Sequence, residues 1–535
     1  MLGLSANGQY LDIPDDFSIT INGKSPMFNE LGSYSYPFKL KYSQRNAMVL
    51  GFMNRPQSTG DPYKTFFGEL QWNGITFFSG TLKVTIGNSG AFEGAIYAHE
   101  GDFWYSIKNT NLQNVDFGHM VWPNESQALA YINGCNNAFY PTRPVCFPQI
   151  FNDNYFDPVS DDPEQQHFNN YRGGYIHNTT LLGNRTVIVP MMYLRYMLDR
   201  IFAQLQFSYI DNVFAVDADL SKLAIFNSLS NNTLCPDFDY TLTDIYFNLH
   251  VPKVKLDMFL NALCKFFNMH IFIDSTSRTA KLVSFKNILS SKEIIDFSKN
   301  IISISVELED KITGIHLSLT NDDADSAFED TSTVQDDQLK RYKGELSHVS
   351  DLPQFPYAEI NDVWMVRDDG YFYTLKPDHT WAQVPVFANN VYSHKMYFNM
   401  TEETSIEICS LHSPGFYIGE CDCKNKIADY KEITPRMFFT TYGSGLMYAS
   451  SATPSYGLWF NQYMDPFFKF WKPMADFLMK TAMVKVQRQC DFVSLRDLDF
   501  SMKYDINGTL YLIRDYQVTL KKNSISPTLF SLYKL

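Results

Sequence analysis

The sequence predicts a β-rich α+β protein, and three observations support this fold class. Short runs of alternating apolar and polar residues, bounded by turn-forming residues, recur in the first 118 residues and again near the end. Aromatic residues make up 16% of the chain, and they favour strands and large apolar contacts. An aromatic-rich core explains this enrichment about equally well. Two segments in the middle carry apolar residues at helical spacing.

Length and charge limit the possible functions. A chain of 535 residues is too long for one core, and roughly three or four domains are expected. The formal net charge of −14 repels phosphate, which disfavours nucleic-acid binding by charge attraction. The eight cysteines are thinly spread and fit reduced thiols in a cytosol. We expect no signal peptide and no transmembrane helix, because the first residues lack a basic apolar leader and no long apolar run occurs.

Residues 1–118 are predicted to form a small barrel or sandwich of short strands. The alternating run 17–21 precedes Asn22-Gly23, and a second Asn-Gly pair stands at Asn73-Gly74. Asn-Gly between alternating runs is a strong signal for a two-residue hairpin turn. Residues 119–185 differ, because prolines interrupt a Tyr-, Phe- and Asn-rich stretch. We interpret that stretch as an insertion ordered by packing on a neighbour.

Residues 186–300 are predicted to form an α+β domain. Helices are expected over 190–202 and 255–267, and the second helix leads into a hairpin, 270–274 and 279–285. Residues 301–345 begin with alternating strands, and ten acidic residues lie between Glu307 and Asp337. Such a charge run usually forms a solvated loop, with a cation site as the lesser alternative.

Residues 346–429 are predicted to form an inserted β-meander. It contains a possible receptor platform of four aromatic residues, Trp364, Tyr371, Tyr373 and Trp381. Aromatic platforms bind sugars or peptides, but the core of a small sheet is the commoner role for such residues.

The most informative segment lies at the end of the chain. An aromatic-rich helix is expected after Trp459, followed by a strand pair that turns at Asn507-Gly508. The residues expected to act in packing or at a subunit interface are Trp459, Phe467, Phe468, Trp471 and Phe500.

The sequence contains no recognisable catalytic signature. Phosphate-binding glycine loops, dinucleotide fingerprints, zinc-protease motifs and nucleophile elbows are all missing from it. We therefore expect no catalytic residues, no cofactor-binding residues, no metal ligands and no cofactor. A glycosidase carboxylate pair, which only the fold brings together, has no local signature to support it.

Three stretches, taken in order, resemble the tail hub, or tail-associated baseplate hub, proteins of tailed bacteriophages. They are residues 36–40 with 67–70 and 73–82, then the helix and hairpin 256–289, and finally 459–535. Similar proteins are encoded by phages and prophages of Bacteroidetes. Together these stretches cover about half of the chain, and the resemblance depends on their order rather than on a strict motif.

This resemblance implies two hub-type β-barrel domains, one at 1–118 and one split between 301–345 and 430–535. It implies a homo-oligomer, a trimer, that forms a ring and contacts the tail tube and the tip or fibre proteins. DNA would pass through the lumen without specific binding, and the subunit would be assembled in the host cytoplasm and located in the virion tail. The host cell surface is a further possible partner.

Two other functions stay open at this point. One is glycan binding, either by a tail adhesion protein whose meander or 119–185 insertion recognises a host surface glycan or, outside phage biology, by a surface protein of a bacterium. The other is a tail-associated peptidoglycan hydrolase, for which both inserted segments are short.

Overall fold

The computed structural model describes only part of the chain. The described residues are 1–28, 33–53, 55, 65–86, 91–98, 100–121, 125–135, 138–148, 150–151, 167–169, 171–172, 175–176, 189–226, 244–251, 254–307, 314–316, 341–343, 381–383, 394–398, 406–410, 416–419, 430–433, 436–443, 446–450 and 467–535.

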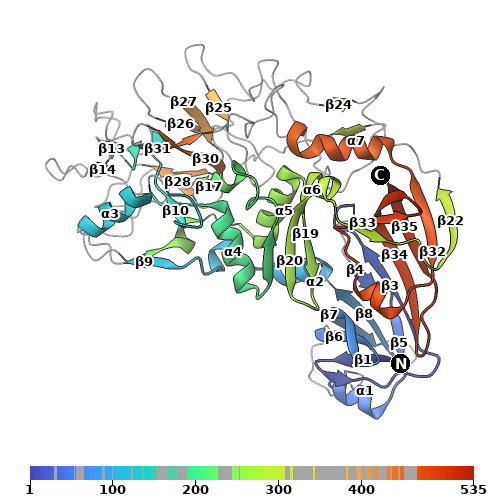
Figure 1. The fold of residues 1–535 in the computed structure, drawn as a ribbon. Helices are drawn as coiled ribbons and strands as arrows, with labels where there is room; N and C mark the ends of the chain where they lie inside the picture. The colour runs from blue at the N-terminus through green and yellow to red at the C-terminus, as the bar shows by residue number, and fades with distance from the viewer. Residues whose placement is uncertain are drawn as a thin grey trace.

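One large sheet brings the two ends of the chain together, and Figure 1 shows its N-terminal strands beside its C-terminal strands. Its strands are β1 (Leu2–Ala6), β2 (Gln9–Tyr10), β3 (Ser18–Lys24), β4 (Ser33–Ser35), β5 (Phe38–Leu40), β6 (Thr65–Trp72), β7 (Ile75–Ile86), β8 (Phe92–Ala98), β21 (Ile294–Asp296), β22 (Ile301–Glu307), β32 (Met483–Arg488), β33 (Lys503–Ile506), β34 (Thr509–Lys521) and β35 (Thr528–Lys534). The main path runs β2-β1-β6-β7-β8-β4-β3-β34-β35-β32-β22.

The predicted β-rich α+β class is confirmed. Among the described residues the large sheet is an open path and does not close into a barrel. The strands of the first 118 residues and those of the C-terminal region join through β3 and β34, which pair antiparallel from Ser18 opposite Lys521 to Lys24 opposite Asp515.

Two of the predicted Asn-Gly turns are confirmed, and one is wrong. Asn73-Gly74 and Asn507-Gly508 close the β6–β7 and β33–β34 hairpins, all four residues having positive φ. Asn22-Gly23, by contrast, lies inside β3. Pairing with β34 on one side and β4 on the other keeps this stretch extended, so tertiary pairing overrides the local turn preference.

The middle of the chain contains a smaller group of helices and strands, here called the smaller α+β region. Its main helices are α4 (Leu194–Gln204) and α5 (Leu256–Phe267), and its sheet is β16-β20-β19, with β16 (Ser208–Asp211), β20 (Thr279–Ser284) and β19 (Met269–Asp274). Asn268, with φ 45°, ends α5 in the left-handed conformation and leads into β19. The predicted helix followed by a hairpin is therefore confirmed.

The other helices are α1 (Gln44–Val49), α2 (Glu100–Ile107), α3 (Glu125–Cys135), α6 (Phe285–Ser290), α7 (Lys472–Lys480) and α8 (Phe492–Arg496), with a π-helical turn at Phe467–Trp471 and 3-10 turns at Leu112–Asn114, Leu220–Lys222 and Phe247–His250. The other strands are β9 (His119–Val121), β10 (Val145–Cys146), β11 (Ile150–Phe151), β12 (His167–Phe168), β13 (Tyr171–Arg172), β14 (Tyr175–Ile176), β15 (Met191–Met192), β17 (Leu223–Phe226), β18 (Asp244–Tyr246), β23 (Gly314–His316), β24 (Arg341–Lys343), β25 (Trp381–Gln383), β26 (His394–Phe398), β27 (Ile406–Ser410), β28 (Phe416–Gly419), β29 (Tyr430–Ile433), β30 (Arg436–Gly443) and β31 (Leu446–Ser450). In the described part of the chain, no helix has the length and apolar character needed to cross a membrane.

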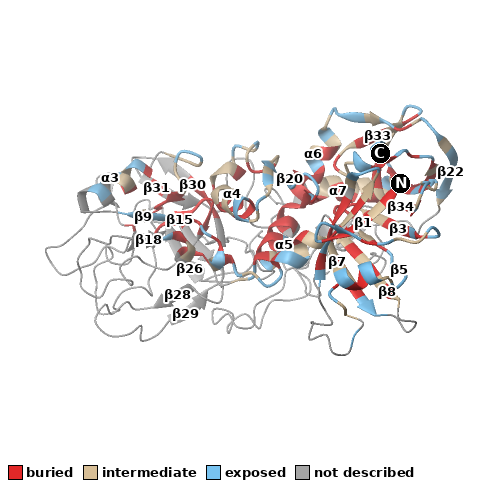
Figure 2. Ribbon diagram, turned by 90° about the horizontal axis from the view of Figure 1, so that it is seen from below, coloured by how far each residue is buried: buried red, intermediate tan, exposed pale blue. Residues whose placement is uncertain are grey.

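The C-terminal strands form a wall between two apolar cores. Alternate residues of a strand point to opposite faces. Accordingly, Met483 and Leu512 belong to the core that the helices share, whereas their neighbours Val484 and Ile513 belong to the core beneath the large sheet. Figure 2 shows buried residues along α5 and in the region of β34. Burial on both faces fixes the register of β32 and β34.

Candidate interaction surface

The C-terminal aromatic segment packs inside the chain. The Trp471 side chain is 2% exposed and lies in the core shared with the helices. Its neighbour Phe470 meets Phe267 of α5 edge to face, with 5.2 Å between ring centroids. The side-chain amide of Asn268 donates to the Phe470 carbonyl at 2.9 Å. The π-helical turn is therefore fastened to the end of α5.

Helix α7 continues this packing toward both ends of the chain. The ring centroid of Phe477 lies 5.3 Å from that of Phe285 in α6 and 6.1 Å from that of Tyr533 in β35. Phe28, from the N-terminal segment, meets Tyr533 at 5.0 Å. These aromatic contacts join four segments that are distant in sequence, and they stabilise one chain rather than a contact between chains.

The remaining sites predicted from the sequence have different outcomes. Phe500 is half-buried and stacks on Tyr516 at 6.0 Å. Of Phe467 and Phe468 the structure describes the backbone, within the π-helical turn, and not the side chains. Trp459 lies outside the described residues.

The predicted receptor platform is almost entirely outside the described residues. This holds for Trp364, Tyr371 and Tyr373. The backbone of Trp381 begins β25, which pairs parallel with β27, but its side chain is also outside the description. The platform stays a prediction.

The most conspicuous described surface is the edge strand β22, here called the β22 edge. In the described part of the chain β22 pairs only with β32, so its outer row of backbone N–H and C=O groups faces away from the sheet. Its side chains are exposed to an unusual degree for apolar residues: Ile302 55%, Ile304 48% and Val306 63%. Figure 2 shows β22 at the periphery of the molecule.

The β22 edge extends an interior face of the sheet. Ile304 stands directly opposite Val486, and Val306 opposite Val484. Residues directly opposite each other in an antiparallel pair project from the same face. Val484 and Val486 are buried in the core beneath the sheet, so the apolar face of that core runs on, uncovered, over β22.

The opposite face of β22 is polar. The Ser303 hydroxyl donates to Gln487 at 3.5 Å, and the Lys485 ammonium lies 2.6 Å from the Glu307 carboxylate. A strand with one polar and one apolar face favours one register with a pairing strand, and its apolar face is the one that a partner has to cover. Long apolar edge strands are sites at which another chain adds to a sheet.

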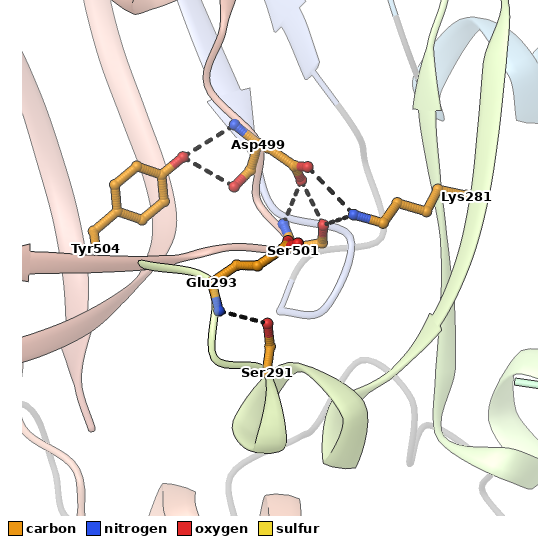
Figure 3. A network of polar contacts seen from close by, with 6 residues as sticks. All are labelled: Lys281, Ser291, Glu293, Asp499, Ser501 and Tyr504. Carbon is orange, nitrogen blue, oxygen red and sulfur yellow. Dashed lines mark hydrogen bonds and ion pairs between the residues drawn. The ribbon is translucent and has the colours of Figure 1, made fainter. Parts of the chain in front are cut away.

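A polar network connects the smaller α+β region to the large sheet (Figure 3). The Lys281 ammonium in β20 donates to the Ser501 hydroxyl at 2.8 Å and lies 3.5 Å from the Asp499 carboxylate. Asp499 also accepts the Ser501 N–H at 2.7 Å and hydroxyl at 2.6 Å. The Tyr504 hydroxyl donates to the Asp499 carbonyl at 2.9 Å, and burial raises the pKa of that phenol.

This network positions two parts of the chain and offers no free nucleophile. Both Asp499 oxygens are engaged by neighbouring donors, and the Ser501 hydroxyl donates to Asp499 while it accepts from Lys281. Within the described ranges, no three His, Cys, Asp or Glu residues are grouped so that they could hold a metal ion.

Solved structures with weak similarity to this chain include two tail proteins. One is the 43 kDa tail protein of prophage MuSo2 from Shewanella oneidensis, at 8% identity and a TM-score of 0.33, covering 99% of this chain and 97% of that one. The other is the tail protein from Neisseria meningitidis MC58, at 7% identity and a TM-score of 0.32, covering 99% of this chain and 95% of that one. These values establish neither a common fold nor a common function. No protein-family model and no curated protein matches the chain.

Proposed function

We propose that this protein is a non-enzymatic structural subunit of a bacteriophage tail. More specifically, it acts as a hub: copies form a ring that joins the tail tube to the tip and surrounds the DNA channel. The ring is a homotrimer that contacts tube and tip or fibre proteins, is assembled in the host cytoplasm, and lies close to the host surface during attachment.

The β22 edge is the single observation that carries this proposal. In the described part of the chain, it combines backbone groups that have no strand partner with apolar side chains that continue an interior face of the sheet. Such a surface is costly to leave in water, and covering it favours association. A structural subunit needs a surface of this kind, whereas catalysis does not.

We assign a second copy of this chain as the occupant of the β22 edge. The free edge follows an Ile-Ser-Ile-Ser-Val pattern, so an added strand has to present apolar residues on the same face and polar residues on the other. A ring of identical subunits supplies such a partner at every junction, by a head-to-tail contact that closes on itself.

The strand pairing supports a hub built from both ends of its chain. The first and third stretches that resemble hub proteins lie in the same sheet, joined through β3 and β34. A subunit formed from both ends of its chain is held by many long-range pairings, which suits a part that bears load during ejection. The formal charge of −14 also suits a channel through which DNA passes without sticking.

The first experiment is to measure the mass of the purified chain in solution by light scattering and to image it by negative stain. The proposal predicts a trimer with a central hole. A chain that stays monomeric at every concentration would contradict self-association through the β22 edge.

Two further assays separate the hub from the other functions. Release of dye from labelled peptidoglycan would show that the protein is a hydrolase, which would contradict the structural role. Specific binding to a glycan array by the monomeric chain would favour an adhesion protein over a hub. A hub shows neither activity.

A further inference from the structure

Helix α4 and strand β16 enclose a small polar cluster in an otherwise apolar contact. Tyr209 and Asp211 are two residues apart on β16 and therefore share a face. Arg195 and Asp199 are four residues apart on α4 and share a face of that helix. The Arg195 and Asp211 side chains form an ion pair between the two elements, with 3.6 Å from Nε to Oδ2.

Three atoms of this cluster are inaccessible to solvent and have no hydrogen-bond partner in the described part of the chain. They are Arg195 Nε, the Tyr209 hydroxyl and Asp211 Oδ2. The 3.6 Å between Nε and Oδ2 exceeds the usual range of about 2.7–3.2 Å for such a hydrogen bond. Buried polar atoms are nearly always satisfied, by protein or by an ordered water.

The surrounding polar groups make hydrogen bonds or ring contacts with other partners, and none of them is hydrogen-bonded to these three atoms. Asp211 Oδ1 accepts the backbone N–H groups of Val213 at 2.9 Å and Phe214 at 2.8 Å. The carboxylate of Asp199 accepts the hydroxyl of Tyr140. The guanidinium of Arg195 lies over the Tyr140 ring, 5.4 Å from its centroid.

We propose that one internal water molecule binds between α4 and β16 and satisfies Arg195 Nε, the Tyr209 hydroxyl and Asp211 Oδ2 together. The water accepts from Arg195 Nε–H and from the Tyr209 hydroxyl, and it donates one hydrogen to Asp211 Oδ2. Internal waters typically make about three hydrogen bonds of this kind. The site thus contains the two donors and one acceptor that a single water requires.

The charges select a neutral occupant. Asp211 repels a halide, and Arg195 repels a metal cation, whereas a water is indifferent to the paired charges. Burial raises the pKa of the Tyr209 phenol well above its ordinary value, so this hydroxyl keeps its proton and remains a donor. The water therefore fastens α4 to the small sheet through polar groups that do not meet directly.

The direct test is a crystal structure at a resolution that shows ordered waters. The expected result is a density peak at hydrogen-bond distance from all three atoms. A direct hydrogen bond from Tyr209 to Asp211, with no peak between the elements, would overturn the proposal. An anomalous peak at the site after a bromide soak would overturn the neutral occupant.

A stability measurement tests the same proposal, because the Tm should fall if the water is bound and should stay the same or rise if it is not. Tyr209→Phe keeps the ring, which stacks on Phe202 with centroids 4.4 Å apart, and removes only the hydroxyl. Removing an unsatisfied buried hydroxyl is neutral or stabilising, whereas removing one bound to a water is destabilising. We expect a lower Tm for Tyr209→Phe than for the control Tyr105→Phe, whose side chain is exposed. An unchanged or raised Tm would refute the water.

Discussion

Gly23 of β3 lies directly beneath the ring of Tyr516 in β34. The two residues stand opposite each other in the antiparallel pair that joins the N-terminal and C-terminal strands. A Cβ on Gly23 would come within 2.0 Å of Tyr516 Cε1 and 2.4 Å of its Cζ. The ring occupies the place of the missing side chain, an arrangement by which an aromatic residue stabilises a glycine in a strand.

We predict that Gly23→Ala destabilises the protein by about 1–3 kcal/mol, because the methyl group has to displace a packed ring. Tyr516 is held by stacking on Phe500 at 6.0 Å and by Phe530 at 5.9 Å, so it has little freedom to move. Denaturant unfolding measures the loss of free energy of unfolding.

The control for this variant is Gly3→Ala in β1, where the nearest atom would be a Tyr10 ring carbon at 3.4 Å, an ordinary contact. In a Tyr516→Ala background, Gly23→Ala should cost less, since the clash is gone. Equal costs in both backgrounds would show that the ring does not restrict the position.

The Asn-Gly pairs show how far local sequence predicts this fold. Asn73-Gly74 and Asn507-Gly508 turn as predicted, because both residues of each pair have room to adopt positive φ between adjacent strands. Asn22-Gly23 has the same local signal, but β3 finds partners on both sides, one of them nearly 500 residues away in the sequence. Local propensity cannot anticipate so distant a partner.

The candidate site was only partly accessible to sequence reasoning. The alternation over 301–307 predicted a strand correctly, but not that its apolar residues would be the exposed ones. Exposure follows from the place of β22 at the end of the sheet path, which depends on β32, far along the chain. The reverse applies to Trp471: its aromatic surroundings indicated packing, and only the fold shows that this packing is internal.

We predict that Trp471→Ala destabilises the chain by about 3–5 kcal/mol, the usual cost of removing a large buried side chain. Trp471 is 2% exposed and belongs to the core that the helices share. Thermal or denaturant unfolding measures the loss, with the exposed Tyr105→Ala as control. A similar change in both variants would contradict the central position of Trp471.

His270 should make the protein less stable on the acid side of neutrality. Complete burial lowers its pKa from the ordinary 6.5 to about 3 in the folded protein, despite a hydrogen bond to the backbone of Pro26, which raises the pKa. Between these values the unfolded chain binds a proton that the folded chain does not, so stability falls as pH drops from about 6.5 toward about 3. Above pH 6.5 His270 is neutral in both the folded and the unfolded chain, so it does not change stability with pH there.

The measurement is the denaturation midpoint of the unaltered chain and of His270→Gln over that pH range. The unaltered chain should lose stability more steeply than the variant, which cannot take up the proton. The matched variant is His119→Gln, at an exposed position of β9. It should lose stability with falling pH as steeply as the unaltered chain does. Parallel curves for His270→Gln and the unaltered chain would exclude His270 as the cause.

The β22 edge yields the prediction most closely tied to the proposed hub. Val306→Lys places a charge on the apolar face that a second copy covers, and burying an unpaired charge is strongly unfavourable. Association should weaken by at least an order of magnitude in Kd, as measured by light scattering across a concentration series. Val306 is 63% exposed, so the folded monomer should tolerate the change.

Val216→Lys is the matched control, because Val216 is 68% exposed and lies in a turn remote from β22 in sequence. It introduces the same charge into the same residue type, and it should leave association unchanged. If both variants weaken association equally, the effect is one of net charge and β22 is not the contact strand. If neither does, the copies meet elsewhere, because a lysine at position 306 cannot be covered by an apolar partner without loss.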